Sequence, residues 1–379
     1  MIKRELGSVC SRLSSGKSIR AENINPTGAY PVIGGNGLRG YTDSYNFDGE
    51  CAVIGRQGAA CGNVRYHSGK AYMTEHAVVV CANDDNDTRY LSYFLSTRDL
   101  GRLSAQSAQP GISVKTLAKQ EVCLPSLGEQ KRVSQLLGTI DSKINANTKQ
   151  NDYLEQCLLA QYDHLFGAAD VYDGTIADIG DVIGGATPSK KKSEYYCANG
   201  IGWITPRDLS NTTDKFIAHG ADDITQLGYN SCSVKLLPAG TVLFSSRAPI
   251  GYIAIATDNV TTNQGFKSVV PHEDTGTAFV YCFLKRNKDR IADAGSGTTF
   301  PEVSGKTMAG IELSLPDVEL CAEFSEWAKP LLDQQRCLEE ENRRLGELRD
   351  ALLPKLMSGE IDVSEVELPT PPNNHLSAD

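Results

Sequence analysis

The sequence lacks the features that mark membrane-spanning and secreted proteins. No apolar run among its 379 residues approaches the roughly 18 residues that a transmembrane helix needs. The charged start Met1–Leu6 has no apolar stretch behind it, so we expect no secretory signal peptide. The 11 cysteines are scattered from Cys10 to Cys337 without a Cys-x-x-Cys pair. This distribution excludes a secreted disulfide scaffold and favours buried, reduced thiols in a cytoplasmic protein.

Basic residues are scarce as well. The chain has 37 Lys and Arg against 47 Asp and Glu, which gives a formal net charge of −10. Proteins that bind nucleic acids usually carry a basic footprint. At first sight, the average charge therefore argues against a nucleic-acid-binding protein.

Catalytic and metal-binding signatures are also missing. The six histidines are isolated and show no metal-ligand spacing, and there is no Gly-x-Ser-x-Gly nucleophile motif. Gly35–Gly40 spells a dinucleotide fingerprint, but Tyr41–Tyr45 behind it is not helical, so no helix N-terminus is available for a pyrophosphate. Gly16–Ser18 and Gly305–Thr307 resemble the end of a phosphate-binding loop, yet both lack the glycine required five positions earlier. An Asn-Pro-Pro-aromatic motif of amino-methyltransferases is also absent, which favours a binding or scaffolding protein.

The sequence does contain an internal repeat, at a constant offset of 191 residues. Lys115–Ala118, followed by Leu-Pro, matches Lys306–Ala309, again followed by Leu-Pro. The same offset relates Gly49 to Gly240, Arg56 to Arg247, Pro110 to Pro301, Asn151 to Asn342, Leu154 to Leu345 and Leu165 to Leu356. A register kept over a hundred residues indicates a duplicated domain and not a solenoid of short repeats.

Each half begins with strand patterns and ends with helix patterns. Short β-branched runs separated by turn residues fill residues 1–125 and 170–316. Apolar residues then recur with helical or heptad spacing in residues 126–169 and 317–359, with Asn147 and Asn151 in the first stripe and Pro330 and Pro354 marking kinks or ends in the second. We predict an α+β fold: two β-rich domains, each followed by a long helix, with the two helices packed as an antiparallel coiled coil in pseudo-twofold symmetry. Ordinary core-facing helices are the alternative. Residues 360–379 form an acidic, Pro-rich tail that we expect to be disordered from Leu368 onward.

Glycine-rich polar loops supply the candidate binding residues. Arg bonds guanine bidentately, Asn and Gln bond adenine, and Lys or backbone N–H groups hold phosphates. The same segments can also be plain turns between strands. The candidates for DNA contact are Arg39, Tyr41, Arg56, Gln57, Gln106, Ser107, Gln109, Lys190, Lys191, Lys192, Arg207, Arg247, Asn263, Gln264, Thr298 and Thr299.

Several strings resemble the specificity subunits of type I restriction–modification systems. The segments Pro31–Tyr41, Gly55–Gly62 and Thr74–Ala77 resemble a common form of the target-recognition domain of that family. Leu124–Ile144 resembles the start of the central helical region, and Leu348–Gly359 resembles the end of the second one. The second half departs from the pattern, because Asp317–Leu320 stands where the helix-opening Glu-Gln is expected and Thr261–Gly265 replaces Thr-Glu-His.

The resemblance implies a function that the residues alone do not. It implies a non-catalytic subunit that binds an asymmetric, bipartite DNA site, one half-site per recognition domain, with the helix pair setting the gap. Two modification subunits would methylate adenine with S-adenosylmethionine, and restriction subunits would add ATP- and Mg²⁺-dependent translocation and cleavage. The departures in the second half imply that the two domains read different half-sites.

Two other classes of function stay open at this point. One is a coiled-coil adaptor whose lobes bind proteins, and the other is a methyltransferase that acts alone. The charge distribution is compatible with DNA recognition, because residues 317–379 hold 6 basic and 15 acidic residues whereas residues 1–125 hold 14 and 11. We therefore expect nearly neutral recognition domains that take much of their phosphate contact from partner subunits.

Overall fold

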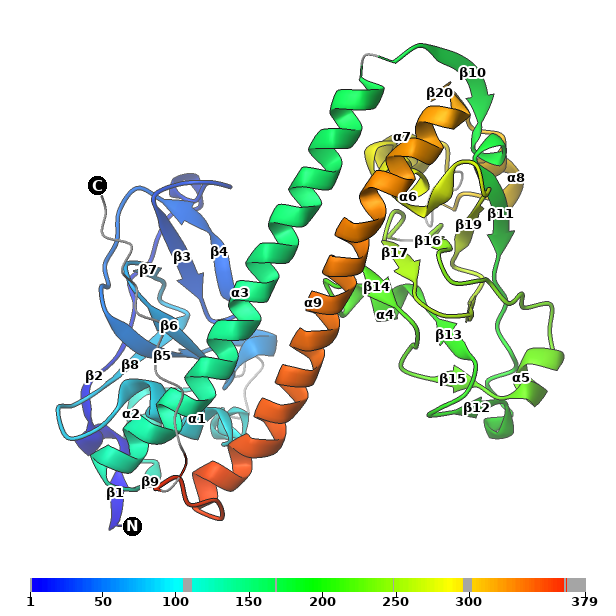
Figure 1. The fold of residues 1–379 in the computed structure, drawn as a ribbon. Coiled ribbons are helices and arrows are strands. Elements are labelled where there is room, and N and C mark those ends of the chain that lie inside the picture. The colour runs from blue at the N-terminus through cyan, green and yellow to red at the C-terminus, as the bar shows by residue number, and fades with distance from the viewer. Residues whose placement is uncertain are drawn as a thin grey trace. The chain divides into compact units, whose positions relative to one another are not determined.

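The computed structural model of the chain describes residues 2–104, 111–167, 169–247, 249–295, 302–364 and 366. The chain divides into two compact units, Met1–Ile144 with Arg344–Asp379, and Asn145–Arg343. Each unit contains one β-rich region and a part of both long helices, α3 (Leu127–Phe166) and α9 (Val318–Ser358) (Figure 1). In the described part of the chain, no helix is both long and apolar enough to cross a membrane.

The first unit is built on a four-stranded antiparallel sheet of order β2-β8-β5-β6. Its central strands are the most apolar ones, because Cys51–Ile54 and Ala77–Val80 are buried on both faces. The strands of this sheet are β2 (Cys10–Ser15), β5 (Glu50–Gly55), β6 (Val64–Ser68) and β8 (Ala77–Ala82). A smaller sheet joins β3 (Tyr30–Gly34) to β4 (Gly37–Thr42) and, in parallel, to β7 (Tyr72–Met73), and a third pairs β1 (Ile2–Glu5) with β9 (Glu121–Leu124).

Two short helices complete the β-rich region of the first unit, α1 (Thr88–Ser96) and α2 (Val114–Ala118). Asp87 caps the start of helix α1, and its carboxylate accepts a hydrogen bond from the backbone N–H of Tyr90 at 2.7 Å. This satisfies one of the free N–H groups of the first turn. The apolar side chains of α1 pack with β5, β8 and the start of α3 in one core cluster.

The second unit repeats this plan. Its main sheet has the order β11-β19-β16-β17-β14, and β13 pairs with β18 in parallel, as β3 does with β7. The strands are β10 (Val171–Thr175), β11 (Gly180–Gly184), β12 (Tyr196–Cys197), β13 (Gly202–Ile204), β14 (Phe216–Ile217), β15 (Asp223–Ile224), β16 (Val242–Phe244), β17 (Ile253–Ala256), β18 (Val260–Thr262), β19 (Lys267–Pro271) and β20 (Glu312–Pro316). The helices besides the long ones are α4 (Pro206–Ser210), α5 (Gln226–Asn230), α6 (Gly276–Arg286), α7 (Lys288–Asp293) and α8 (Gly305–Ala309). The predicted α+β class and the predicted duplication are confirmed.

The offset of 191 residues is visible in single contacts. Helices α2 and α8 have the same length and begin at Val114 and Gly305. Near the start of α3, the Ser134 hydroxyl donates to the Asp87 carboxylate that caps α1, and Ser325 of α9 donates to the carbonyl of Thr275, which caps α6. In each unit, the same turn of a long helix therefore binds the start of the helix that covers the sheet.

Within the second unit, α3 and α9 pack in antiparallel directions. The amide of Asn147 donates to Glu341 at 2.7 Å and to Asn342 at 3.0 Å, and Asn151 donates to Glu339 at 3.0 Å. Residues further along α3 thus contact residues earlier in α9, as expected for antiparallel helices. Asn147 is only 2% exposed, and the amide groups of both asparagines donate across the helix pair, so the predicted polar seam positions are confirmed. The side-chain oxygen of Asn151 is buried and has no partner among the described residues.

The first unit also joins parts of both long helices. Asp141 of α3 accepts a hydrogen bond from Arg349 of α9 at 3.1 Å. After α9, the chain turns at Gly359, which has a left-handed φ of +78°, and Val363 is buried in the core of this unit. The guanidinium of Arg132 donates to the carbonyls of Val363 and Val366 at 2.7 Å each. The first residues of the acidic tail are therefore a packed segment, while Leu368–Asp379 lies outside the described residues.

A buried ion-pair network joins both long helices of the second unit to its β-rich region. The Lys215 ammonium, 8% exposed, contacts the Glu155 carboxylate of α3 and donates to Gln335 of α9 at 2.6 Å. Lys285 of α6 contacts the same carboxylate, and the hydroxyl of Tyr281 donates to it at 3.0 Å. Burial opposes ionisation of Glu155, but the two ammonium groups outweigh it and hold its pKa at about 2.

Two details of the sequence interpretation are wrong. Of the two alternatives for Pro330 and Pro354, kinks or ends, the ends are wrong, because α9 continues through both positions. Arg56 is also not the structural counterpart of Arg247, since the loop that carries them is shifted by one residue, as described next.

Candidate nucleic-acid interface

Five segments meet in the first unit and form what we call loop cluster 1. They are 16–18, 34–36, 55–57, 74–76 and 111–112. Backbone hydrogen bonds hold them together: Lys17 N–H to Met73, Thr74 N–H to Ile33, Arg56 N–H to His76 and Ile112 N–H to Arg56, at 2.9–3.0 Å. The arrangement therefore depends on the main chain, and the side chains are free to vary.

The second unit holds an equivalent loop cluster 2. Its segments are 185–187, 205–207, 245–247, 263–265 and 302–303. The matching hydrogen bonds run from Ala186 N–H to Thr262, Asn263 N–H to Ile204, Ser246 N–H to Gly265 and Val303 N–H to Ser246, at 2.7–3.0 Å. Because the two sets of bonds correspond one to one, the two clusters are the same structural device with different side chains.

Close approach of the main chain fixes glycine at one place in both clusters. A Cβ atom on Gly16 would lie 2.2 Å from the carbonyl oxygen of Met73, and one on Gly185 would lie 2.2 Å from that of Thr262. No side chain fits there. The Gly16–Ser18 string that resembles a phosphate-binding loop is thus a packing requirement of loop cluster 1. It presents Lys17 as an exposed side chain at the edge of the cluster.

The correspondence corrects one predicted equivalence. Gln57 forms an isolated bridge with Gly111, and Arg247 forms the matching bridge with Glu302. Arg247 therefore corresponds to Gln57, and Arg56 corresponds to Ser246. Gln57 and Arg247 are 190 positions apart, whereas Gly111 and Glu302 are 191 positions apart. One residue has therefore been gained or lost between this loop and Gly111 in one of the two halves. The match between Arg56 and Arg247 at the constant offset of 191 is therefore a coincidence of the sequence.

In the first unit, the predicted residues Arg39, Arg56 and Gln57 belong to one surface. Arg39 is exposed on β4, and its Cδ lies 2.8 Å from the position that a Cβ on Gly34 would take. Gln57 is exposed and its Oε1 lies 3.1 Å from Nδ1 of His76. Tyr41 is half-buried further along β4, where its backbone pairs with Asn25, so the structure does not bring it to loop cluster 1.

Loop cluster 2 gathers most of the predicted residues of the second unit. Arg207 is exposed at the start of α4, and the hydroxyl of Thr187 donates to Gln264. The side chain of Asn263 accepts the N–H of Gly265 at 2.8 Å, so it shapes the loop. Lys190, Lys191 and Lys192 follow Thr187 and are all exposed. The ammonium of Lys190 lies 5.8 Å from the centre of the Trp203 ring, and that of Lys192 lies 5.0 Å from the Tyr195 ring.

A carboxylate orients the arginine of loop cluster 2. Nε of Arg247 lies 3.0 Å from Glu302, and the ammonium of Lys267 lies 3.8 Å from the same carboxylate. Burial lowers the pKa of Lys267, and Glu302 opposes that effect in part. Arg247 keeps nearly half of its side chain exposed. One ion pair uses only part of its five donors, so the guanidinium can still bind a second partner.

The remaining predicted residues, Gln106, Ser107, Gln109, Thr298 and Thr299, lie outside the described residues. Sequence reasoning missed Lys17, Thr187, Lys267, Glu302 and the segment Thr74–His76 as parts of the site. The Thr-Glu-His string was visible as a family feature, but only the fold places it beside Gln57. The other four carry no signal in the sequence that separates them from ordinary surface residues.

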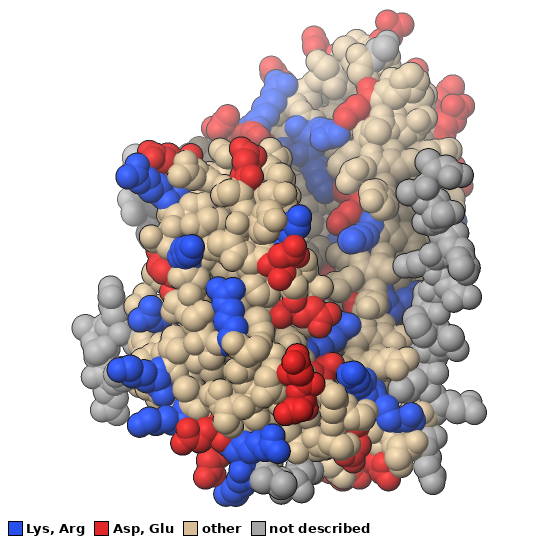
Figure 2. Space-filling view, turned by 90° about the vertical axis from the view of Figure 1, so that its left-hand side faces the viewer, with Lys and Arg blue, Asp and Glu red and all other residues tan. Residues whose placement is uncertain are grey.

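Charges of both signs are mixed on the exposed face shown in Figure 2, without a broad region of one sign. In the described part of the chain, no group of three or more His, Cys, Asp or Glu side chains could hold a metal ion. This face therefore carries no strong electrostatic field of one sign.

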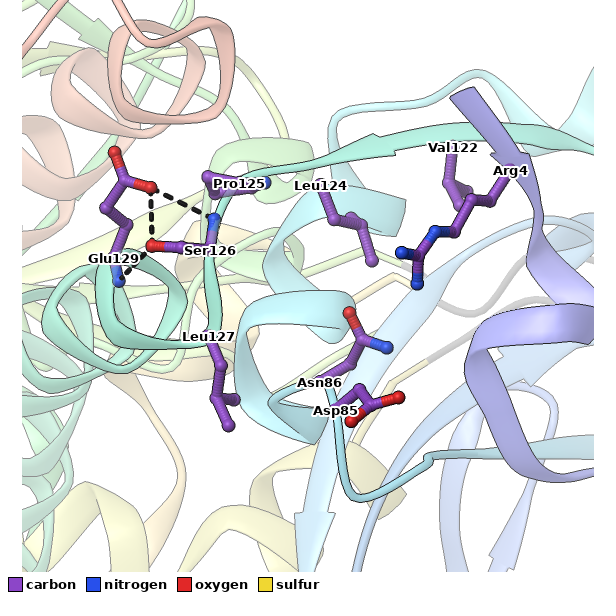
Figure 3. A pocket seen from close by; sticks show the side chains of 9 residues that line it. All are labelled: Arg4, Asp85, Asn86, Val122, Leu124, Pro125, Ser126, Leu127 and Glu129. Carbon is purple, nitrogen blue, oxygen red and sulfur yellow. Dashed lines mark hydrogen bonds between the residues drawn. The ribbon is translucent and has the colours of Figure 1, made fainter. Parts of the chain in front are cut away.

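A separate hollow of about 640 Å³ lies at the start of α3 in the first unit (Figure 3). Its lining includes Arg4, Asp85 and Leu124, and none of the predicted DNA-contacting residues. Ser126 and Glu129 contact each other there, with the hydroxyl 2.6 Å from the carboxylate and the Ser126 N–H 3.0 Å from it. They form a capping box that completes the helix N-terminus, so this serine–carboxylate contact has a structural explanation.

Two equivalent, backbone-held loop clusters on an α+β fold with two long helices define a protein built from a duplicated domain. Comparison with known proteins gives the family. The model of the type I restriction modification DNA specificity domain matches residues 1–156 and 169–322. The chain therefore belongs to the family of type I restriction–modification specificity subunits, as the sequence resemblance predicts.

Individual relatives match parts of the chain. It is 42% identical over 146 residues to the type I restriction enzyme MjaIX specificity subunit of Methanocaldococcus jannaschii, which covers 38% of this chain and 34% of the relative. It is 35% identical over 159 residues to the EcoprrI specificity subunit of Escherichia coli, covering 41% and 39%. The chain thus spans little more than a third of each of these relatives. The crystal structure of a type I S subunit from M. genitalium matches with a TM-score of 0.63 at 18% identity, over 94% of this chain and 95% of that one, which supports the fold.

Proposed function

We propose that the chain recognises an asymmetric, bipartite DNA sequence, with one half-site bound by each loop cluster. One observation supports this proposal above the others. The backbone hydrogen bonds of the two clusters correspond one to one, whereas the side chains that they present differ at nearly every position. A protein that holds one loop scaffold twice and varies only its polar side chains is suited to reading two different sequences in the major groove.

The proposal assigns no chemistry to this chain. Two modification subunits would bind it and transfer methyl groups from S-adenosylmethionine to adenine, and restriction subunits would use ATP and Mg²⁺. The names of the relatives, all type I restriction enzyme specificity subunits, support this division of labour. Such a complex would act in the cytoplasm, where the DNA is accessible. The mixed charge on the face shown in Figure 2 supports the expectation that the partner subunits supply much of the phosphate contact.

DNA binding as a function of salt concentration tests the proposal against a protein-binding adaptor. The complex of this chain with its modification subunits should bind duplex DNA with an affinity that falls steeply as salt rises. Lys17→Ala should weaken binding about equally on all sequences and reduce the salt slope by about one. Lys119→Ala, an exposed lysine beyond α2, is the matched control and should keep the wild-type slope. A complex whose retention on DNA is independent of this chain would contradict the proposal.

A further inference from the structure

One oxygen of the Glu75 carboxylate in loop cluster 1, Oε2, lacks a hydrogen-bond partner among the described residues. The other oxygen, Oε1, lies 3.4 Å from Nε2 of His76, whereas Oε2 is buried and faces no donor in the part of the chain that the structure describes. The hydroxyl of the preceding Thr74 is in the same situation. A buried carboxylate oxygen without a donor is costly unless a ligand supplies one.

The surroundings of Glu75 are fixed by other groups. The Thr74 N–H binds Ile33 at 2.9 Å, and the carbonyl of His76 accepts the N–H of Arg56 at 3.0 Å, so the backbone on both sides of Glu75 is held. The His76 ring lies between the Gln57 carbonyl and the Glu75 carboxylate, with one nitrogen toward each. Of the Glu75 side chain, 38% is exposed. Its torsions can therefore turn the carboxylate toward a ligand while the loop stays in place.

The charge of Glu75 limits what that ligand can be. A carboxylate repels phosphate groups, so within a DNA interface it is favourable only opposite a hydrogen-bond donor. In the major groove the donors are the exocyclic amino groups, N4 of cytosine and N6 of adenine. Accordingly, we propose that Glu75 is a specificity-determining residue that accepts a hydrogen bond from one such amino group in the first half-site. This inference depends on the proposed function.

The equivalent position in loop cluster 2 supports the assignment. The parallel pairs Val32–Tyr72 and Trp203–Thr261 place Glu75 and Gln264 at the same point of the two loops. Gln264 is exposed, and its carbonyl accepts the Thr187 hydroxyl, which leaves its NH₂ group to donate. One cluster thus presents only acceptors at this position and the other presents donors. That difference makes the two half-sites different.

Duplexes that lack single amino groups test the inference with the intact complex. After the half-sites are mapped, each cytosine of the first half-site is replaced by 2-pyrimidinone and each adenine by purine. Wild-type binding should fall by about tenfold or more at one of these positions. In the Glu75→Ala complex, the same replacement should change binding less than twofold. The comparison cancels the weaker base pairing of the altered duplex, since both proteins bind the same DNA.

Glu75→Gln and two controls complete the test. Glu75→Gln keeps the shape of the side chain and should alter the base preference at one position of the first half-site only. Glu121→Gln removes an exposed carboxylate paired with Lys3, away from the loop cluster, and should leave the preference unchanged. An equal penalty for amino-group removal in wild type and Glu75→Ala would overturn the inference while leaving the proposed function intact. Absence of a bipartite site for the wild type would instead refute the proposed function itself.

Discussion

At the scale of single residues, the sequence indicates which residue types bind but not which positions correspond. Composition and loop context indicate Arg39, Gln57, Arg247 and Gln264. The fold places Gln57 in loop cluster 1 with Arg39 beside it, and Arg247 and Gln264 in loop cluster 2. The sequence could not predict that Arg247 corresponds to Gln57. The repeat was recognised by a constant offset of 191 residues, and such an offset does not show a one-residue shift within a single loop. Only backbone hydrogen bonds reveal it.

Arg247→Ala should relax base preference in the second half-site alone. The guanidinium is oriented by Glu302 and has free donors, which fits a bidentate contact worth about 1–3 kcal/mol of discrimination. Methylation of a randomised site library by the reconstituted complex measures the preference at each position. Lys235→Ala, an exposed lysine of the same unit outside the cluster, is the control. A uniform loss of methylation at all positions would show that Arg247 contacts a phosphate.

At the scale of elements, the long helices were predicted almost to the residue. The predicted 126–169 and 317–359 compare with Leu127–Phe166 and Val318–Ser358. Helical and heptad spacing is a local signal, so the sequence carries it. The network around Lys215 was not predictable, because it joins residues that are 60 to 120 positions apart in the chain.

The ion pair of Glu155 predicts an acid-sensitive second unit. Its pKa of about 2 lies below the usual value, so the pair stabilises the fold above about pH 5 and the stabilisation is lost as the pH falls toward 2. The loss is on the order of 2–3 kcal/mol. Both tryptophans, Trp203 and Trp327, belong to this unit, so their fluorescence reports its unfolding by urea.

Glu155→Gln should be less stable at pH 7, because it leaves the Lys215 ammonium buried without its counter-charge. Its stability should also depend less on pH between 5 and 2 than that of the wild type. Asp333→Asn, which removes an exposed carboxylate of α9, is the control and should follow the wild-type curve. Equal acid dependence of Glu155→Gln and wild type would contradict the assignment.

The segment after α9 predicts two different truncation phenotypes. Removing residues 360–379 exposes the core around Val363 and deletes both carbonyl partners of Arg132. The first unit should lose about 2–4 kcal/mol of stability. Hydrogen exchange of the buried amides of α1 measures this loss. Removing only residues 367–379 should leave their protection unchanged, and equal protection in both truncations would contradict a structural role for the segment.

At the scale of the whole molecule, the duplication was readable from the sequence and the boundaries of its compact units were not. The repeat divides the chain into consecutive halves, whereas the first unit combines Met1–Ile144 with Arg344–Asp379. The reason is physical: two antiparallel helices return the end of the chain to its beginning. Each helix therefore contributes to both units.

Shortening both helices should change the spacing of the two half-sites and nothing else. One heptad is removed from α3 around Ile144 and one from α9 around Arg344, where the units adjoin in sequence, so that the helical face is preserved. The methylated motif should keep its bases and change its gap. Removing five residues from each helix, which turns the two faces by about 140°, is the comparison and should abolish methylation. Altered half-site bases after a heptad deletion would contradict the prediction that the helix pair sets only the gap between the half-sites.

The most direct test of the central claim is to map methylated adenines in a host without its own system that expresses this chain and its modification subunits. The account predicts one asymmetric motif with two specified half-sites separated by a gap of unspecified bases. It further predicts that Arg247→Ala relaxes one half-site and Glu75→Gln the other. A contiguous palindromic motif, or methylation that does not depend on this chain, would contradict the account.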